Sequence, residues 1–313
     1  MVQGADRDQF TIPPAHLGTR RRRGTRPQIL LYTLLSLLAV LCLIPMLVVV
    51  STSFSTEDDV RENGYPVIVR DFSLQAYRTL MGTSSRTVRN AYSHTVSVSA
   101  VGTVMSLLVC SMTAYVLARR SFFLRKQLTF FIFFTMLFNG GLVPTYIVIT
   151  QIYRLQDTFW VLVLPLVVVP WYIIILRTFM QGISFELIES AKIDGASEFR
   201  IYLTIIMPLA KPGLACIGLF ILLRYWNSWF EAMLYINRSE WVTLQLMLIR
   251  MQQRMEAMFD ESAMVQSSLR IMDIPSETLR MAMVVVAGGP MLVVFPFFQK
   301  YFVRGLTIGS VKG

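Results

Sequence analysis

The chain has 313 residues, of which 54% are hydrophobic and only 15% are charged. Soluble globular domains carry about 25% charged residues, so this composition excludes a soluble globule and predicts an integral membrane protein. The net charge of +10 does not indicate a nucleic-acid partner, because Lys and Arg stand at the ends of apolar runs rather than on one face of a soluble domain.

Residues 1–28 form a polar arm with four consecutive arginines at 20–23. We expect this arm to be cytosolic, because basic segments stay on the inner side of the membrane; specific binding of anionic lipid is the alternative. An apolar run over about 29–51 is long enough to cross a bilayer, and it is expected to stay as a membrane helix rather than be cleaved. The segment over about 52–90 balances acids and bases, which favours the outer side.

Three further spans are predicted before the chain becomes polar again. The second, about 91–118, is rich in Ser, Thr and Ala, which predicts an interior helix because small residues let helices approach closely in lipid. The third, about 127–150, contains Asn139 followed by two glycines. A weak helix at this depth needs its backbone satisfied by protein or water, so we expect the break to face the bundle interior or a cavity; a purely structural kink is the alternative. The fourth span covers about 158–179.

A charged insert over about 184–212 follows the fourth span, and its pattern predicts two short helices. Ser184 is placed to cap the first helix, and Leu187, Ile188 and Ala191 fall on one of its faces. Gly195 is the type of residue that ends a helix with a positive φ. The first helix is therefore expected to end in a tight turn.

The second helix of the insert is expected to begin at the cap residue Ser197. Apolar residues then recur at i, i+4 and i+7, at Phe199, Leu203 and Ile206. Pro208 and Pro212 are expected to stop this helix. The result is a helix-turn-helix that is too polar for the bilayer, which indicates a docking element.

The fifth span, about 213–235, carries charge at membrane depth. An Arg at a helix centre costs about 2.5–3.5 kcal/mol on insertion scales, so Arg224 is expected to have a partner or water. At about 100° per residue, one polar stripe collects Arg224, Asn227, Ser228, Glu231 and Tyr235. This stripe is predicted to line a solute path; an internal ion pair of Arg224 with Glu231 is the alternative. On the opposite face, Trp226, Trp229 and Phe230 either pack against a helix or lipid, or contact sugar rings.

A last outer segment, about 236–275, is expected to contain a Met-rich amphipathic helix, and a sixth span over about 278–302 precedes a basic tail at 304–313. The segments assigned to the inner side carry a clear excess of Lys and Arg, whereas the outer segments do not. The sequence thus predicts an all-α integral membrane protein with six transmembrane helices over 29–303. Both termini and the helix-turn-helix between spans 4 and 5 are expected in the cytosol.

The insert also resembles a known motif. Its sequence reads Glu189-Ser190-Ala191-x-x-Asp194-Gly195-Ala196, followed by Phe199 and Pro208. This spacing resembles the E-A-A-x-x-x-G loop in the permease subunits of binding-protein-dependent ABC importers. Ser190 stands where that family usually has Ala, and one small residue in place of another should still pack. Residues 138–149 and 225–236 look like the maltose-type carbohydrate branch of the family, and the resemblance extends over about 29–313.

In that family the loop is a coupling helix seated on a cytoplasmic ATPase subunit. The resemblance therefore implies that seven residues dock the ATPase: Glu189, Ser190, Ala191, Asp194, Gly195, Ala196 and Phe199. It implies assembly in a bacterial cell membrane with a related second permease, two ATPase subunits and an extracytoplasmic solute-binding protein. The implied cargo is a carbohydrate, in particular an oligosaccharide. Its expected path includes six residues: Arg224, Asn227, Ser228, Glu231, Tyr235 and Asn139.

Enzymatic signatures are missing from the chain. No Gly-Lys dipeptide occurs, so there is no phosphate-cradling G-x-x-x-x-G-K-[ST] loop, and ATP and Mg²⁺ are expected to bind to the partner ATPase subunits. Neither H-E-x-x-H nor G-x-S-x-G is present. The three cysteines fall within predicted spans without metal spacing, which indicates buried free thiols. We therefore expect no enzyme activity, cofactor or metal in this chain.

Three other functions are compatible with parts of the pattern. A secondary transporter would use Arg224 and Glu231 as a proton or ion relay. A permease of the same superfamily for amino acids or peptides would keep the insert and change the cargo. A structural or signalling membrane protein would bind no ATPase.

Overall fold

The computed structural model describes residues 25–82, 85–253 and 277–309. Over these ranges the regular structure is helical, apart from one isolated β-bridge between Ser55 and Phe72. The chain divides into two compact units, residues 1–47 and 48–313. Helix α1 (Thr25–Ser53) contains Pro45 and is apolar on nearly all sides from Ile29 to Val50, which is the pattern of a helix surrounded by lipid.

The core of the second unit is built around α4 (Ser85–Ala118). This helix packs against α8 (Pro170–Gln181) and α12 (Lys211–Trp226), and α12 packs in turn against α15 (Glu277–Gly309). The small residues of α4 allow these contacts: a methyl group at Gly102 would overlap the buried Tyr225 ring of α12. The Tyr225 hydroxyl donates a hydrogen bond to the Val163 carbonyl (2.9 Å). The prediction of an interior second span is confirmed.

Within the described ranges, three helices are long and apolar enough to cross a membrane: α1, α4 and α15. Three further candidates are bent pairs. The first joins α5 (Arg125–Leu137) to α6 (Leu142–Ile147) and the π-helix η1 (Val148–Ile152), with a bend of 112°.

The second bent pair joins α7 (Phe159–Val163) and the 3₁₀ turn η2 (Leu164–Leu166) to α8, with a bend of 52°. In the third pair, the segment 198–209 meets α12 at 83°. The described residues therefore contain up to six spans, and the predicted number is reached only if each bent pair counts as one.

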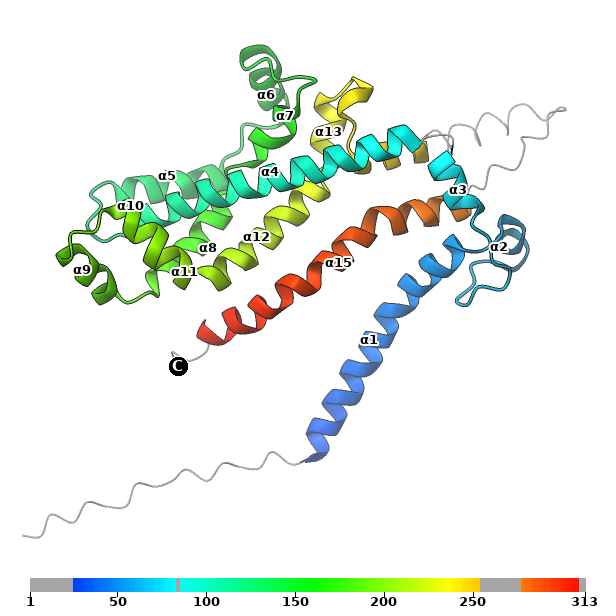
Figure 1. Ribbon diagram of the computed structural model, residues 1–313, viewed down its shortest axis with the longest axis horizontal. Helices are drawn as coiled ribbons and strands as arrows, with labels where there is room; N and C mark the ends of the chain where they lie inside the picture. The colour runs from blue at the N-terminus through cyan, green and yellow to red at the C-terminus, as the bar shows by residue number, and fades with distance from the viewer. Residues whose placement is uncertain (1–24, 83–84, 254–276, 310–313) are drawn as a thin grey trace, which may run out of the picture. The chain divides into compact units, whose positions relative to one another are not determined.

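The two ends of the second unit carry different elements. The insert, beginning with α9 (Phe185–Ile193), lies at one end, and α2 (Glu57–Asn63) and α3 (Gln75–Gly82) lie at the other (Figure 1). Within the predicted Met-rich segment, residues 244–253 are helical, and 254–276 lie outside the described residues.

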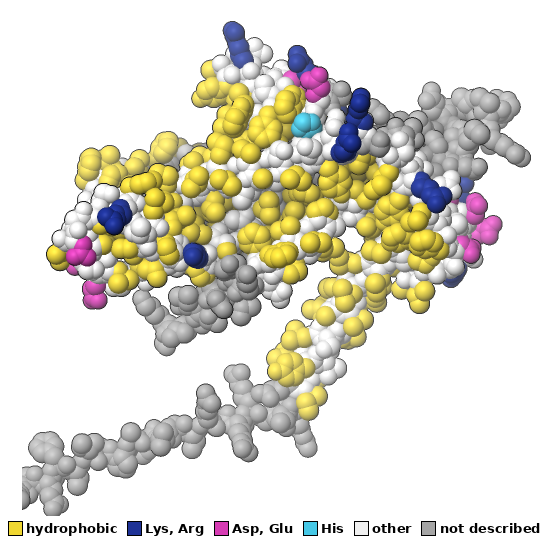
Figure 2. All heavy atoms as spheres, viewed as in Figure 1, with side chains coloured by type: hydrophobic (Ala, Val, Ile, Leu, Met, Phe, Trp, Pro, Cys, Tyr) yellow, Lys and Arg dark blue, Asp and Glu magenta, His cyan; other side chains and the backbone are white. Residues whose placement is uncertain are grey.

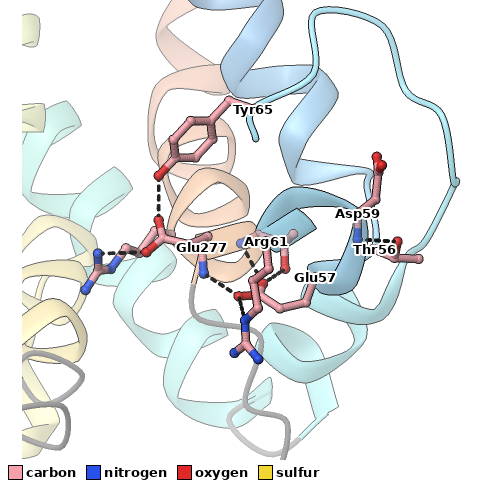
Figure 3. Close-up of polar contacts among 8 residues, drawn as sticks. Thr56, Glu57, Asp59, Arg61, Tyr65 and Glu277 are labelled. Atoms are coloured by element: carbon pink, nitrogen blue, oxygen red, sulfur yellow. Dashed lines mark hydrogen bonds and ion pairs between the residues drawn. The ribbon is translucent and has the colours of Figure 1, made fainter. Parts of the chain in front are cut away.

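A carboxylate at the end that carries α2 holds the start of α15. The Glu57 side chain accepts hydrogen bonds from the backbone N–H groups of Glu277 (3.2 Å) and Thr278 (3.1 Å). Tyr65 donates a further bond to the Glu277 carboxylate (3.0 Å), as Figure 3 shows. A negative charge at a helix N-terminus is stabilising, so this contact joins α2 to the last long helix.

The surface of the second unit is that of a membrane protein. On the face in Figure 2, apolar side chains form a broad surface over α4 and its neighbours, and charged side chains lie at its margins. Of the three free cysteines, Cys110 is buried, Cys216 is half-buried and Cys42 is exposed. The expectation that all three thiols are buried is wrong for Cys42, which lies in the part of α1 within the first unit, where the described side chains are exposed.

Candidate functional site

The first helix of the insert, α9, ends in a Schellman motif. The N–H of Ala196 donates to the Ala191 carbonyl (2.9 Å), and the N–H of Gly195 donates to the Lys192 carbonyl (3.0 Å). Gly195 has φ +76°, as the sequence predicts. A Cβ atom there would meet nothing within 4 Å, so the requirement for glycine comes from the backbone conformation rather than from crowding.

Two details of the predicted first helix are corrected. Ser184 occupies the cap position of α9, but its side chain makes no capping hydrogen bond. Ile188 and Ala191 are buried as expected, whereas Leu187 is exposed. Helical spacing places these three residues on one face of α9, but the bundle covers only the part of that face that carries Ile188 and Ala191.

The second helix begins as predicted, with the Ser197 hydroxyl accepting the N–H of Arg200 (3.3 Å). It does not stop at Pro208. Helix α10 (Glu198–Ile201) continues through the π-helix η3 (Tyr202–Ile206) into α11 (Met207–Leu209), and the chain turns only at Ala210. The π-helix shifts the hydrogen-bond register just before the proline, and Pro208 lies in the first turn of α11, where its missing donor costs little.

The predicted docking residues lie together at the Gly195 turn. Glu189, Ser190, Asp194 and Phe199 are exposed, Ala196 is half-buried and Ala191 is buried. Large apolar side chains of the insert also face outward: Ile193 is 86% exposed and Phe199 60%. Apolar side chains on an otherwise charged surface, next to a fixed turn, are typical of a protein contact surface.

A charge cluster joins the insert to the end of α4. The Glu198 carboxylate contacts the Arg119 guanidinium (3.1 Å) and the Lys192 ammonium (2.7 Å), and it accepts a hydrogen bond from the Tyr115 hydroxyl (2.5 Å). Arg119 is 8% exposed, and in the described part of the chain its Nε and Nη1 have no hydrogen-bond partner, so its charge depends on Glu198. A second link is the hydrogen bond between Ser111 of α4 and Tyr202 (2.7 Å).

The electrostatics of Glu198 follow from these contacts. Partial burial alone would raise the pKa of its carboxyl group, but the contacts with Lys192, Tyr115 and Arg119 outweigh burial and lower the pKa from 4.5 to about 2. Sequence reasoning missed this cluster. The opposite charges of Lys192 and Glu198, one on each side of the glycine turn, were a local signal for their ion pair. Arg119 is 79 positions away from Glu198, so no local pattern could indicate that contact.

The polar stripe predicted on the fifth span does not lie on one continuous helix. Helix α12 ends at Trp226, and α13 (Trp229–Tyr235) begins after a break at Asn227 and Ser228. The Asn227 side chain donates to the Leu223 carbonyl (3.0 Å), and the Ser228 hydroxyl donates to the Tyr225 carbonyl (2.9 Å). These side-chain bonds compete with the helical pattern, so counting at 100° per residue fails beyond the break.

The stripe residues consequently differ in exposure. Arg224 and Asn227 are exposed and Glu231 is half-buried, while Ser228 and Tyr235 are buried. The Tyr235 ring stacks on Tyr146 with centroids 5.8 Å apart. Among the described residues there is no ion pair between Arg224 and Glu231, so the alternative of an internal pair is not supported.

The aromatic residues of this span separate in the same way. The Trp226 side chain is buried and donates from Nε1 to the Ala287 carbonyl of α15 (3.0 Å), whereas Trp229 and Phe230 are exposed. Trp226 therefore packs against a helix, which is one of the two interpretations of this face. The other two rings lie in α13, beyond the break.

The break predicted near Asn139 is present but does not face the interior of this chain. Helix α5 ends at Leu137, and Gly141 adopts φ +87° before α6 begins. Asn139 accepts a hydrogen bond from the Gly141 N–H (3.0 Å), which satisfies part of the freed backbone. Both residues are exposed, since none of the helices that the structure describes covers them.

Comparison with known proteins agrees with this architecture. Residues 106–308 match the family described as binding-protein-dependent transport system inner membrane component. A permease protein of Bacillus subtilis (strain 168), YtcP of the polygalacturonan/rhamnogalacturonan transport system, is 37% identical over 91% of this chain and 97% of its own length. Protein LplC of the same organism is 36% identical over 87% of this chain and 90% of its own length.

A solved structure is similar over nearly the whole chain. It is a crystal structure of a bacterial ABC transporter involved in the import of the acidic polysaccharide alginate, and the matched chain has a TM-score of 0.76 and 27% identity. The match covers 90% of this chain and 98% of that one. The chain therefore belongs to the family of inner membrane components of binding-protein-dependent transport systems.

Membership of this family tests several of the functions expected from the sequence. The chain is a multi-pass membrane permease and not an enzyme, as predicted, and permeases of ABC importers work with an ATPase and a solute-binding protein. A gradient-driven secondary transporter and a structural or signalling protein are not favoured. YtcP and the alginate importer are both named for sugar polymers, whereas the name of LplC states no cargo. None of the three is named for amino acids or peptides, so a permease for those cargoes is not favoured either.

Proposed function

We propose that this chain forms half of the transmembrane pathway of an ATP-driven oligosaccharide importer in the bacterial cell membrane. The other half is a related second permease, two ATPase subunits bind on the cytosolic side, and an extracytoplasmic protein delivers the solute. The observation that carries the proposal is the insert: a charged segment with exposed apolar side chains, ordered by a glycine turn and joined to a core helix.

The proposed orientation places the insert and both termini in the cytosol. It is supported by the positions of these elements: the insert lies at one end of the second unit, and α2 and α3 lie together at the other end (Figure 1). It is also supported by the excess of Lys and Arg in the segments on the insert's side. The permease domain then covers about 29–303, with the coupling segment at 184–212 and short cytosolic segments at 1–28 and 304–313.

The insert transmits motion in this proposal. Glu189, Ser190, Ala191, Asp194, Gly195, Ala196 and Phe199 form the surface that docks on an ATPase subunit. When ATP closes the paired ATPases, the insert moves with the subunit on which it is seated. The Glu198 cluster and the Ser111–Tyr202 hydrogen bond connect the insert to α4. Movement of the insert therefore moves α4, and the helix bundle tilts from inward-open to outward-open.

The solute path is proposed to include Arg224, Asn227, Ser228, Glu231, Tyr235 and Asn139. Arg224 forms no ion pair with any residue that the structure describes, and a cation at membrane depth then requires water or solute, which supports a pathway position. Asn227 and Asn139 are exposed at helix breaks; each side chain bonds within its own segment and also faces outward, where it can meet a sugar hydroxyl. The buried Ser228 hydroxyl bonds at the break after α12, and the buried Tyr235, at the end of α13, stacks on Tyr146.

Reconstitution tests this function. The relatives named for polygalacturonan and alginate make an acidic oligosaccharide the first cargo to test. The chain, purified with its second permease and ATPase, should take up oligogalacturonide into proteoliposomes only with ATP and a solute-binding protein. Uptake driven by a proton or sodium gradient without any ATPase would contradict the proposal, and uptake of peptides in place of saccharides would contradict the cargo.

A further inference from the structure

A groove of about 940 Å³ lies on a part of the second unit that the proposed transport function does not use. It runs between α5 and α8, which are neighbours in the bundle. The residues that line it on α5 recur every three or four positions from Arg125 to Met136, and those on α8 are Trp171, Ile174 and Arg177. The groove therefore follows one face of each helix.

One end of the groove is strongly basic. Arg125 and Lys126 lie in the first turn of α5, Arg177 lies near the end of α8, and Arg120 lies in the turn between α4 and α5. No Asp or Glu lines the groove, and none of the four basic side chains forms an ion pair within the part of the chain that the structure describes.

The half-buried Arg177 shows most clearly that this charge lacks a partner. Its Nε is buried and has no hydrogen-bond partner among the residues that the structure describes, and the like charge of Arg125 acts on it. Repulsion between neighbouring cations is relieved when an anion binds between them. The basic end thus has the electrostatics of an anion site.

The rest of the groove is apolar. Phe130, Phe133, Met136 and Trp171 line it, and all four are exposed. Arg125 and Met136 are eleven positions apart on α5, which corresponds to about 16 Å along the axis. This length is about half of the 30 Å hydrocarbon core of a bilayer, so the groove spans one leaflet.

We propose that this groove binds one anionic phospholipid. The phosphate lies among Arg120, Arg125, Lys126 and Arg177, and an acyl chain lies along the aromatic side chains. Basic pockets between membrane helices bind anionic headgroups. A free phosphate ion would contact only the basic end of the groove, whereas a lipid also covers its apolar wall. A helix of another protein in the groove would leave four cations without a counter-ion unless it brought acidic residues.

Lipid retention tests the site. The transporter complex containing the full chain is equilibrated in micelles with equal amounts of dioleoyl phosphatidylglycerol and dioleoyl phosphatidylcholine, and retained lipids are counted by native mass spectrometry. The parent should retain one phosphatidylglycerol selectively. Each basic side chain removed should lower the selectivity about fivefold, so Arg125→Gln with Arg177→Gln should lower it roughly 25-fold. Arg125→Lys with Arg177→Lys keeps the charge and should retain most of the selectivity.

Two controls distinguish a lipid site from a general effect of charge and from a free phosphate site. Arg86→Gln with Arg89→Gln removes the same charge from exposed positions at the other end of α4 and should leave selectivity unchanged. Trp171→Ala shortens the apolar wall and should weaken retention of phosphatidylglycerol. If inorganic phosphate displaced the lipid and Trp171→Ala had no effect, the site would be a phosphate site and the lipid assignment would be wrong. A photo-crosslink from Phe133→p-benzoylphenylalanine to the second permease, with no retained lipid, would also overturn it.

Discussion

At the scale of single residues, Gly195 shows what backbone conformation alone decides. Its φ of +76° closes the two hydrogen bonds that end α9, and the space around it is open. Side chains at this position are limited by the left-handed conformation and not by neighbours, because the nearest atoms leave room for a Cβ. The residue therefore sets the angle between α9 and α10.

Substitution of Gly195 tests this turn. Gly195→Val should cost about 1–3 kcal/mol locally, because a β-branched residue is strained at positive φ, and the two helices of the insert should be misplaced. The protein should still insert, while ATP hydrolysis and uptake become uncoupled in the reconstituted complex. Gly195→Asn is the matched control, since Asn tolerates this conformation. Normal coupled uptake by Gly195→Val would show that the turn is not needed.

Glu198 supplies a prediction about pH. Because its folded pKa of about 2 lies below its ordinary value of 4.5, its contribution to stability is fully present above pH 4.5 and is lost as the pH falls toward 2. Glu198→Gln should lower stability at neutral pH by about 1 kcal/mol, since the carboxylate is 52% exposed and solvent screens it.

The measurement is the difference in thermal midpoint between the parent and Glu198→Gln as a function of pH. The difference should stay constant from about pH 7 to pH 4.5 and shrink below that. A difference that vanished between about pH 6 and 5 would mean that another group is titrating. Arg200→Gln, an exposed change on the same insert without an ion pair among the described residues, is the control.

At the scale of elements, the bundle depends on close approach between α4 and α12. The Tyr225 ring lies against Gly102 of α4, and its hydroxyl bonds to the Val163 carbonyl at the end of α7. In lipid, such packing and interhelical hydrogen bonds replace the hydrophobic force that holds soluble helices together. The small residues of α4 are therefore a structural requirement of this contact.

Gly102→Ala tests that requirement. The added methyl group would overlap the Tyr225 ring, so the ring must shift, and overpacking of this kind costs about 1–3 kcal/mol. The thermal midpoint in detergent should fall. Gly288→Ala in α15 adds the same methyl group where nothing lies within 4 Å, and it should leave the midpoint unchanged or slightly higher. Equal effects of the two substitutions would contradict the packing argument.

At the scale of the whole molecule, the proposed coupling requires the insert and the α2–α3 end to lie on opposite sides of the membrane. In a variant without the three native cysteines, Asp58→Cys in α2 and Asp194→Cys in the insert place one exposed thiol at each end. A membrane-impermeant maleimide added to intact cells should label Asp58→Cys and should reach Asp194→Cys only after permeabilisation. Labelling of Asp194→Cys from outside would reverse the orientation and end the docking proposal.

The amino-acid sequence by itself was sufficient for the membrane class, the positions of the apolar runs, the Gly195 turn, the Ser197 cap and the break after Leu137. Each of these depends on hydropathy over one stretch or on the backbone preference of a single residue, and such local properties can be read in order along the chain. The motif around Gly195 also indicated the family, which the matched residues 106–308 confirm.

Only the tertiary structure decided how distant segments combine. It brought Arg119 to Glu198, ended α12 at Trp226, left the Asn139 break exposed and placed α5 beside α8 to form the basic groove. Periodicity assumes a regular helix and contains no information about partners, so it failed where side-chain hydrogen bonds at Asn227 and Ser228 interrupt the helix. Contacts between residues far apart in sequence depend on the packing of whole helices, and packing is a property of the folded bundle.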